Sequence, residues 1–145
     1  IPMLKDAENP HILSLSPPLN ITARWLGAHT GYTLAKYGMT MATLGLAAEF
    51  AKDGVAANTL WPATTIATAA VQFALGGDAM MKVSRTPEIY ADAAYEVITT
   101  PASERSGETL IVEDVLAAAG ITDFSGYAAV PGTPDSELFP DIFLD

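Results

Sequence analysis

Tyr32 and Lys36 are the two side chains of this sequence whose types and spacing suggest chemistry. Residues four apart on a helix share a face, with Cβ atoms about 5–6 Å apart, so the Lys36 ammonium can approach the Tyr32 phenol. A free tyrosine titrates near about 10, and a nearby cation favours its phenolate. Lowering the pKa to about 7 needs about 4 kcal/mol, which a lysine and a positively charged cofactor ring could supply together. Such a base exchanges a proton with an alcohol or a carbonyl as a hydride moves.

The segments on either side of this pair predict the elements that would position it. Residues 11–16 and 55–60 are apolar enough to form strands buried on both faces of a parallel sheet. Residues 31–50, between them, favour a long helix whose apolar stripe would consist of Leu34, Met41, Leu44 and Ala48. The order strand, loop, helix, strand is typical of an α/β crossover unit, in which ligands bind at the carboxyl ends of the strands. We therefore expect Tyr32 beside the loops that follow the two strands.

The rest of the chain continues the α/β pattern. Residues 19–30 predict a loop without a clear period, and residues 63–77 predict a partly helical lid, rich in Ala and Thr, that ends by about residue 80. The predicted elements that follow are a helix at 86–99, a strand at 109–113, a short helix at 114–119 and an acidic tail at 121–145. The first of these helices is expected to bury Ile89, Ala93, Val97 and Tyr95. The tail is expected to dock through its aromatic residues on its own domain or on a neighbouring subunit.

The composition restricts the classes of function. A chain of 145 residues that is half apolar has the length of one globular domain. Its net charge of −10 and its scattered basic residues argue against nucleic acids and membrane surfaces as partners. It has no cysteine, and its two histidines, His11 and His29, stand apart, so we expect no disulfide and no metal site. No apolar run reaches the about 18 residues of a membrane span, and the sequence predicts a soluble, cytoplasmic protein.

Several short motifs together resemble one enzyme family. A strand with serines precedes the Tyr-x-x-x-Lys motif, and Asn58-Thr59-Leu60-Trp61-Pro62 follows it. The other motifs are Ala91-Asp92-Ala93-Ala94-Tyr95, Tyr127-Ala128-Ala129-Val130-Pro131-Gly132 and Pro140-Asp141-Ile142-Phe143-Leu144-Asp145. Along essentially all of its length the chain resembles the C-terminal half of a short-chain dehydrogenase/reductase, and the tail motifs match one subgroup most specifically. The resemblance implies part of a Rossmann-type, doubly wound parallel sheet, NAD or NADP as cofactor, reversible oxidation of an alcohol to a carbonyl, and a homodimer or homotetramer.

The resemblance also implies roles for individual residues. Tyr32 corresponds to the general acid/base, and Lys36 to the residue that tunes it and hydrogen-bonds the nicotinamide ribose, so both lie at the cofactor. Pro62 and the threonines after it correspond to the segment that holds the carboxamide, with Thr65 as the expected contact. The catalytic serine is a departure, because this chain has Pro17 where most of the family has that serine. Either Ser16 has taken over the role or the role is vacant.

The glycine-rich phosphate loop of the family does not occur in these 145 residues. The chain also starts at Ile1 rather than at a methionine, so we expect it to be the catalytic half of a single dehydrogenase domain, cut from a longer sequence. The leading hypothesis is an oxidoreductase for a hydrophobic alcohol or carbonyl, because the predicted lid at 63–75 has no Arg or Lys to hold an anionic group. The alternative is a non-catalytic binding or scaffold protein on a degenerate dehydrogenase fold.

Other polar and aromatic residues have simpler interpretations. Trp25 and Trp61 could shape a pocket, but packing is the more common role of a tryptophan near a strand end. Glu113 and Asp114 are expected to start a helix rather than to act as an acid/base pair, and Asn58 is expected to hold backbone. The sequence leaves open whether the stripe of Met39, Met41 and Leu44 is core or subunit interface.

Overall fold

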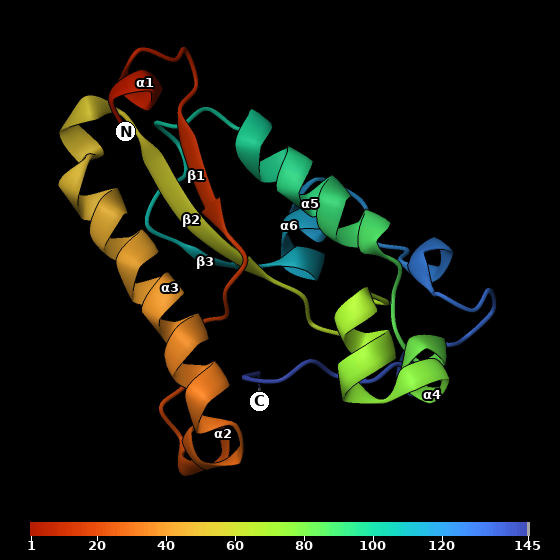
Figure 1. Ribbon diagram of the computed structural model, residues 1–145. Helices are drawn as coiled ribbons and strands as arrows, with labels where there is room; N and C mark the ends of the chain where they lie inside the picture. Colours follow the sequence, from red (N-terminus) through yellow and green to blue (C-terminus); the bar gives the residue numbers. More distant parts are fainter. Residues whose placement is uncertain (145) are drawn as a thin grey trace.

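A three-stranded parallel sheet lies between helices in the computed structural model, which describes residues 1–144 (Figure 1). The strands are β1 (His11–Ser14), β2 (Ala56–Trp61) and β3 (Thr109–Ile111), in the order β1-β2-β3. The helices are α1 (Pro2–Lys5), α2 (Ala23–Ala28), α3 (Thr30–Glu49), α4 (Gly77–Lys82), α5 (Pro87–Thr99) and α6 (Val112–Ala118). Helix α3 covers one face of the sheet, and α5 and α6 cover the other. The last residue of the Pro140–Asp145 motif lies outside the described residues.

Shorter segments connect these elements. Turns of 3-10 helix cover Ala51–Asp53, Ser125–Tyr127 and Asp135–Glu137, and a π-helical segment covers Val71–Leu75. The π-helical segment and α4 occupy most of the region that the sequence predicts to be a partly helical lid. Within residues 1–144, no helix has the length and apolarity that a membrane crossing requires.

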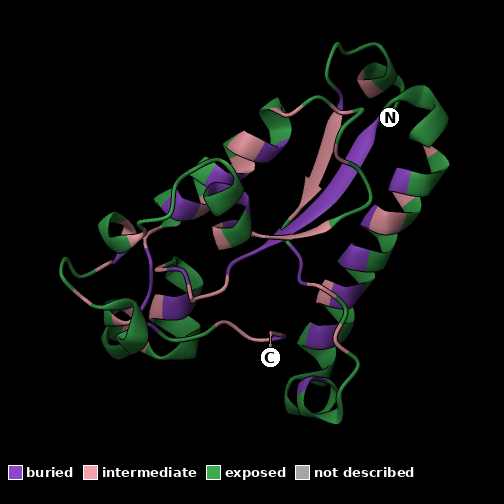
Figure 2. Cartoon of the chain, turned by 180° about the vertical axis from the view of Figure 1, so that it is seen from behind, coloured by how far each residue is buried: buried purple, intermediate pink, exposed green. Residues whose placement is uncertain are grey.

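Strand β2 is the centre of the fold. All six of its residues are buried, and Figure 2 shows it as a continuous purple strand between its two neighbours. Leu13 of β1 lies opposite Asn58, and Leu110 of β3 lies opposite Leu60. The fully buried Asn58 side chain donates to the Arg105 carbonyl and accepts from the Glu108 amide, at 3.0 Å each. Asn58 therefore holds backbone, as predicted.

The main apolar core lies between the sheet and the pair α5 and α6. Leu60, Ile89 and Leu116 are fully buried in it. Ala93 and Val97 join Ile89 on the buried face of α5, as predicted, but Tyr95 is 62 % exposed and that part of the prediction is wrong. Two residues turn a helix by about 200°, so a residue midway between two buried ones points to solvent.

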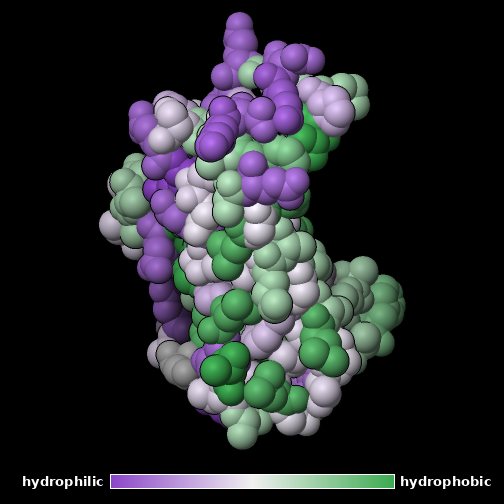
Figure 3. All heavy atoms as spheres, turned by 90° about the vertical axis from the view of Figure 1, so that its left-hand side faces the viewer, coloured by the Kyte–Doolittle hydropathy of each residue, from purple (hydrophilic) through white to green (hydrophobic). Residues whose placement is uncertain are grey.

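Helix α3 packs with a face that the sequence did not predict. The buried residues of α3 are Thr33, Tyr37, Thr40, Thr43 and Ala47. Leu34 and Met41 of the predicted apolar stripe are 68 % and 61 % exposed, and apolar side chains gather on this side of the molecule in Figure 3. Leu34 and Met41 are therefore not core residues. The buried threonine hydroxyls of α3 are instead satisfied by hydrogen bonds, from Thr33 to the Trp25 carbonyl, from Thr40 to the Pro17 carbonyl and from Thr43 to the Ser14 hydroxyl.

Three element boundaries also differ from expectation. Strand β1 ends at Ser14 rather than Ser16 and is only half-buried, as expected for a strand at the edge of this three-stranded sheet. The segment predicted as a loop at 19–30 contains α2, which is too short to show a hydrophobic period. Strand β3 ends at Ile111, because Val112 and Glu113 already form the first turn of α6. Glu113 and Asp114 thus lie at a helix start, as predicted.

Candidate active site

Three side chains of α3 connect the helix to the carboxyl end of β1. Lys36 Nζ donates to the Leu15 carbonyl oxygen at 2.8 Å, and Thr40 Oγ1 donates to the Pro17 carbonyl oxygen at 2.7 Å. One turn further on, Thr43 Oγ1 donates to Ser14 Oγ at 2.6 Å. Residues three and four apart share a helix face. These bonds fix α3 between Lys36 and Thr43 against the edge of the sheet where α/β proteins bind ligands.

Tyr32 and Lys36 lie together at this edge, as their spacing predicts. The Lys36 Nζ atom is 5.8 Å from the centroid of the Tyr32 ring and 5.3 Å from the centroid of the Trp61 ring. Trp61 is the last residue of β2, so the pair also adjoins the second strand end. Tyr32 is 46 % exposed, which leaves the phenol accessible to a small molecule.

The electrostatics of the pair differ from the simple expectation. Partial burial raises the pKa of Tyr32 above its ordinary value, and the nearby Asp141 carboxylate raises this pKa further. Burial lowers the pKa of Lys36, while Asp141 opposes this shift. The lysine thus does not by itself bring the phenol towards neutrality. Additional positive charge is needed for that, such as the oxidised nicotinamide ring considered from the sequence.

Asp141 is a residue of this site that sequence reasoning missed. Burial raises its pKa to about 6, with the Glu113 carboxylate also raising it, while the Ile142 backbone N–H and the Lys36 ammonium lower it. More than one hundred positions separate Asp141 from Tyr32, so no local spacing connects them. The only available signal was the acidic residue within the specific tail motif.

Phe143 brings the tail into the same site. Its ring is 2 % exposed and contacts a cluster of buried aromatic side chains. Its centroid lies 5.9 Å from that of Trp25, 5.1 Å from that of Tyr37, 6.0 Å from that of Trp61 and 6.1 Å from that of Tyr32. Both tryptophans therefore pack, and the tail docks on its own chain through Phe143. Phe139, by contrast, is 48 % exposed.

Ser16 lies next to the carbonyl group that Lys36 binds, but its own position is unusual. The side chain is fully buried, and within the described chain its hydroxyl has no hydrogen-bond partner. A buried hydroxyl without a partner costs about 1–3 kcal/mol, so such groups are uncommon unless they serve a ligand or strain. Ser14 differs, because its hydroxyl oxygen accepts a hydrogen bond from Thr43. Ser16 thus remains the serine with an unused hydroxyl at this edge.

The segment predicted to hold a carboxamide is already bound inside the protein. The Ala63 N–H donates to Glu113 Oε2 at 2.8 Å, and the Thr65 N–H donates to the Phe139 carbonyl at 2.9 Å. The Thr65 hydroxyl is 2.8 Å from the Ser84 hydroxyl, and Pro62 is buried. The structure therefore joins Thr65 to the tail rather than to the pair of Tyr32 and Lys36.

Arg85 is a second residue that the sequence did not single out. It is 3 % exposed, donates to the Phe124 carbonyl at 2.8 Å, and pairs with Asp135 at 3.0 Å. Its Nε atom is 3.7 Å from a carboxylate oxygen of Glu113. This cation lies just after the predicted lid, and its pairing makes it a structural clamp for the tail rather than a binder of anionic substrates.

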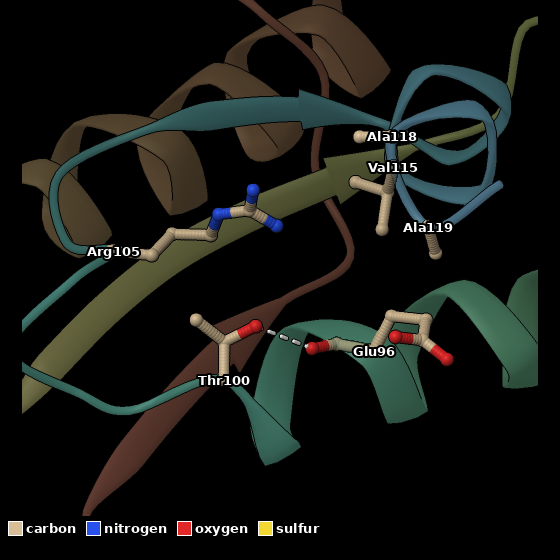
Figure 4. A pocket seen from close by; sticks show the side chains of 6 residues that line it. All are labelled: Glu96, Thr100, Arg105, Val115, Ala118 and Ala119. Carbon is tan, nitrogen blue, oxygen red and sulfur yellow. Dashed lines mark hydrogen bonds between the residues drawn. The ribbon is translucent and has the colours of Figure 1, made fainter.

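A separate pocket lies at the opposite end of the sheet. Its volume is about 170 Å³, and its lining residues are Glu96, Thr100, Arg105, Val115, Ala118 and Ala119 (Figure 4). The Thr100 hydroxyl, which faces this pocket, donates to the Glu96 carbonyl at 2.8 Å. Ligands of parallel α/β sheets bind at the carboxyl ends of the strands, so this pocket is not where the chemistry is expected.

No family model matches the chain. Individual proteins do align with it along its whole length. Hydroxysteroid dehydrogenase-like protein 2 of Danio rerio is 51 % identical over 145 residues, which are 100 % of this chain and 34 % of that protein. A short-chain dehydrogenase of Mycobacterium thermoresistibile has 53 % identity and a TM-score of 0.86, over 99 % of this chain and 50 % of its own. A putative dehydrogenase of Xanthomonas campestris has 55 % identity and a TM-score of 0.90, over 99 % of this chain and 51 % of its own.

These matches cover only part of each relative. The chain spans about a third of the curated relative and about half of the two solved structures. The name of the curated relative corresponds to the subgroup that the tail motifs indicated. The parallel sheet with helices on both faces matches part of a Rossmann-type dehydrogenase fold, as the sequence predicted.

Proposed function

Because the chain belongs to the short-chain dehydrogenase/reductase family, we propose that it is the catalytic part of an NAD(P)-dependent oxidoreductase. The reaction would interconvert a hydrophobic alcohol and its carbonyl. The observation that carries this proposal is the position of Tyr32 and Lys36 on one face of α3, beside the carboxyl ends of β1 and β2. Both strand ends supply groups that contact the pair.

Tyr32 is proposed to transfer the proton. During reduction a hydride is added to the carbonyl carbon, and the Tyr32 hydroxyl gives its proton to the carbonyl oxygen; oxidation reverses both transfers. The raised pKa of Tyr32 keeps the phenol protonated at neutral pH, which suits the proton donor of the reductive direction. The unused hydroxyl of Ser16 is proposed to polarise the same oxygen. Lys36 contributes positive charge that is oriented by the Leu15 carbonyl.

NAD or NADP is proposed as the cofactor, which supplies or accepts the hydride when bound. The residues present fit the nicotinamide end, because Lys36 provides a cation with hydrogen-bond donors at the correct edge of the sheet. They do not fit the pyrophosphate end, since the 145 residues contain no glycine-rich loop at a helix start. Binding of a complete dinucleotide would therefore need residues beyond these 145. The bonded Ala63 and Thr65 amides leave Lys36 as the better-supported contact.

A hydrophobic substrate is supported by the surroundings of the phenol. The half-exposed Tyr32 ring stacks on the buried Phe143 ring, and the nearby Asp141 carboxylate would repel an anion. Arg85 is paired and buried, so it is not free to bind a substrate carboxylate or phosphate. An uncharged alcohol or carbonyl with an apolar body is the substrate class that these groups accept best.

The decisive experiment replaces Tyr32 with Phe in the full-length protein. Loss of the hydroxyl removes the proton donor, so we expect reduction of an apolar aldehyde by NADPH or NADH to fall at least about 100-fold. The matched control is Tyr95→Phe, because Tyr95 is an exposed tyrosine on α5. Equal turnover by wild type and the Tyr32→Phe variant would rule out the oxidoreductase.

A non-catalytic binding or scaffold role is the second candidate. It is favoured by one observation, namely that the Ala63 and Thr65 amides are bound within the protein rather than available to a cofactor. Titration calorimetry of the full-length protein with NADPH and NADH separates the candidates. Absence of binding by both nucleotides would support the scaffold role and contradict the enzyme.

Association into a homodimer or homotetramer is proposed through the outer face of α3. Leu34, Met39 and Met41 are exposed on this helix, and apolar side chains gather on this side of the molecule (Figure 3). Exposed apolar surface of this kind often marks a protein–protein interface. Light scattering of the full-length protein tests this, and a monomeric molar mass would contradict it.

A further inference from the structure

The last residues that the structure describes, 139–144, form a segment that we call the tail strap. Its first half runs antiparallel to the loop that follows β2, with Thr64 opposite Pro140. The Phe139 N–H donates to the Val83 carbonyl at 2.8 Å, and the Asp141 N–H donates to the Ala63 carbonyl at 2.9 Å. The tail strap is thus attached to the loop after β2 and to the residue after α4 before it reaches Tyr32.

Two side chains hold its second half. The Trp61 indole N–H donates to the Ile142 carbonyl at 3.0 Å, and the Asn20 side-chain amide donates to the Phe143 carbonyl at 3.4 Å. Phe143 has a φ of 75°, a left-handed conformation that residues other than glycine rarely adopt. Such a conformation persists where the surrounding contacts impose it, and such residues cluster at functional sites.

One of the four aromatic contacts of Phe143 differs from the rest. The rings of Trp25, Tyr37 and Trp61 are tilted against it by 53° to 59°, and all three are buried. The Tyr32 ring lies only 11° from parallel to it, and Tyr32 is half-exposed. The three tilted rings pack in a core. The nearly parallel ring is that of Tyr32, which is the one ring of these four that faces solvent.

A proton donor has to be held in one orientation to be efficient, because misplacement of about 1 Å can cost about 100-fold in rate. A half-exposed tyrosine near the start of a helix has few packing contacts that would restrict its rotamer. The Lys36 ammonium donates to the Leu15 carbonyl and lies 5.8 Å from the Tyr32 ring centroid, whereas the Phe143 ring lies nearly parallel to the Tyr32 ring. The flat ring of Phe143 supplies the missing restriction.

We propose that Phe143 is a positioning residue for Tyr32, and that the tail strap completes the active site by stacking this ring on the proton donor. This inference rests on the proposed oxidoreductase function. It assigns a role to a residue more than one hundred positions away from the catalytic pair.

The first experiment compares three variants of the full-length protein. Phe143→Ala removes the ring, Phe143→Leu keeps most of the apolar volume without a flat ring, and Phe143→Tyr keeps the ring. We expect kcat to fall about 10-fold or more for the Ala and Leu variants and to stay within about twofold for the Tyr variant. The KM for the nucleotide should stay unchanged in all three, because the proposed role of Phe143 concerns Tyr32 and not Lys36, the proposed nucleotide contact. If the Ala variant does not fold, the difference in kcat between the Leu and Tyr variants tests the proposal.

Two outcomes of that experiment would overturn the proposal. Wild-type kcat in the Leu variant would show that apolar volume is sufficient and stacking is not needed. A nucleotide KM that rises in step with the loss of kcat would show a general structural role instead.

The second experiment needs no enzyme activity. Tetranitromethane nitrates accessible tyrosines, and peptide mass spectrometry reports the rate at Tyr32 relative to Tyr95, the exposed internal reference. Loss of the covering ring in Phe143→Leu should raise this ratio several-fold, whereas Phe143→Tyr should leave it unchanged. An unchanged ratio in the Leu variant would refute the contact. An inactive wild type that still shows the shift would refute the oxidoreductase and support the positioning of Tyr32 by the strap.

Discussion

Helices α3 and α5 cover opposite faces of the same sheet, yet they are held to it by different forces. Helix α5 buries Ile89, Ala93 and Val97 in an apolar core, where burial contributes free energy without strict geometry. Helix α3 buries threonines that hydrogen-bond to the end of β1 and leaves leucine and methionine exposed. Hydrogen bonds are directional, so they fix position better than apolar contacts do. The α5 side stabilises the fold, and the α3 side aligns Tyr32 and Lys36.

The largest effect on stability is expected from Ile89→Ala on α5. Ile89 is fully buried in the main core, and such truncations cost about 2–5 kcal/mol. Below the unfolding transition, NADPH-dependent turnover should stay close to wild type, because no side chain of the site is changed. Chemical denaturation and a turnover assay at low temperature measure the two quantities. A loss of turnover without a loss of stability would break the division between the two helices.

Asp141→Asn tests whether the α3 side gives up stability for its chemistry. The folded-state pKa of Asp141 is raised to about 6 from an ordinary value of 3.8, so the ionised carboxylate destabilises the folded protein. The favourable contribution of its protonated form is complete below about pH 4 and is lost as the pH rises through about 6. We expect the variant to match wild type at pH 4 and to exceed it by about 1–3 kcal/mol at pH 8.

Denaturation at these two pH values checks this prediction, with Asp6→Asn as an exposed control. The same variant should lower the pKa of Tyr32, because Asp141 raises it. Ultraviolet titration of the phenol measures this second effect. If the difference in unfolding free energy between Asp141→Asn and wild type increased towards low pH, it would contradict a raised pKa of Asp141 in the folded protein.

Thr40→Val is expected to have the smallest effect on stability and to be the most informative about alignment. The substitution keeps the shape but leaves the buried Pro17 carbonyl without its donor, which costs about 1–2 kcal/mol. Turnover should fall as well, because Pro17 adjoins Ser16 and Thr40 fixes the strand end against α3. The control is Thr99→Val on α5, where an exposed threonine bonds within its own helix and the change should stay within about 0.5 kcal/mol. Equal effects at both positions would remove the distinction between the helices.

The sequence predicted the elements whose signals are local. Helix α5 is defined by Pro87 at its start and by the spacing of Ile89, Ala93 and Val97. The apolar run at β2 predicted a strand that is buried along its whole length, as the structure shows. The prediction of the buried face of α3 was wrong, because threonine ranks as a polar residue. A hydropathy pattern does not record that groups at and after the end of β1 accept hydrogen bonds from the hydroxyls of Thr40 and Thr43.

The candidate site was predictable only in part for a related reason. The pair of Tyr32 and Lys36 is four residues apart, so helix geometry brings its members together. Asp141 and Phe143 reach the pair through the tail strap, whose path depends on contacts such as the Trp61 indole with the Ile142 carbonyl. A left-handed phenylalanine has no signature in the order of amino acids.

The aromatic cluster around Phe143 also determines which part of the protein the intrinsic tryptophan fluorescence reports on. The sequence has two tryptophans, Trp25 and Trp61, and both rings lie within about 6 Å of the Phe143 ring centroid. Intrinsic fluorescence therefore monitors the surroundings of Phe143 in the tail strap, whereas circular dichroism monitors the helices. If the strap detaches before the core opens, the two signals will follow different denaturation curves, and neither alone will describe a single two-state transition.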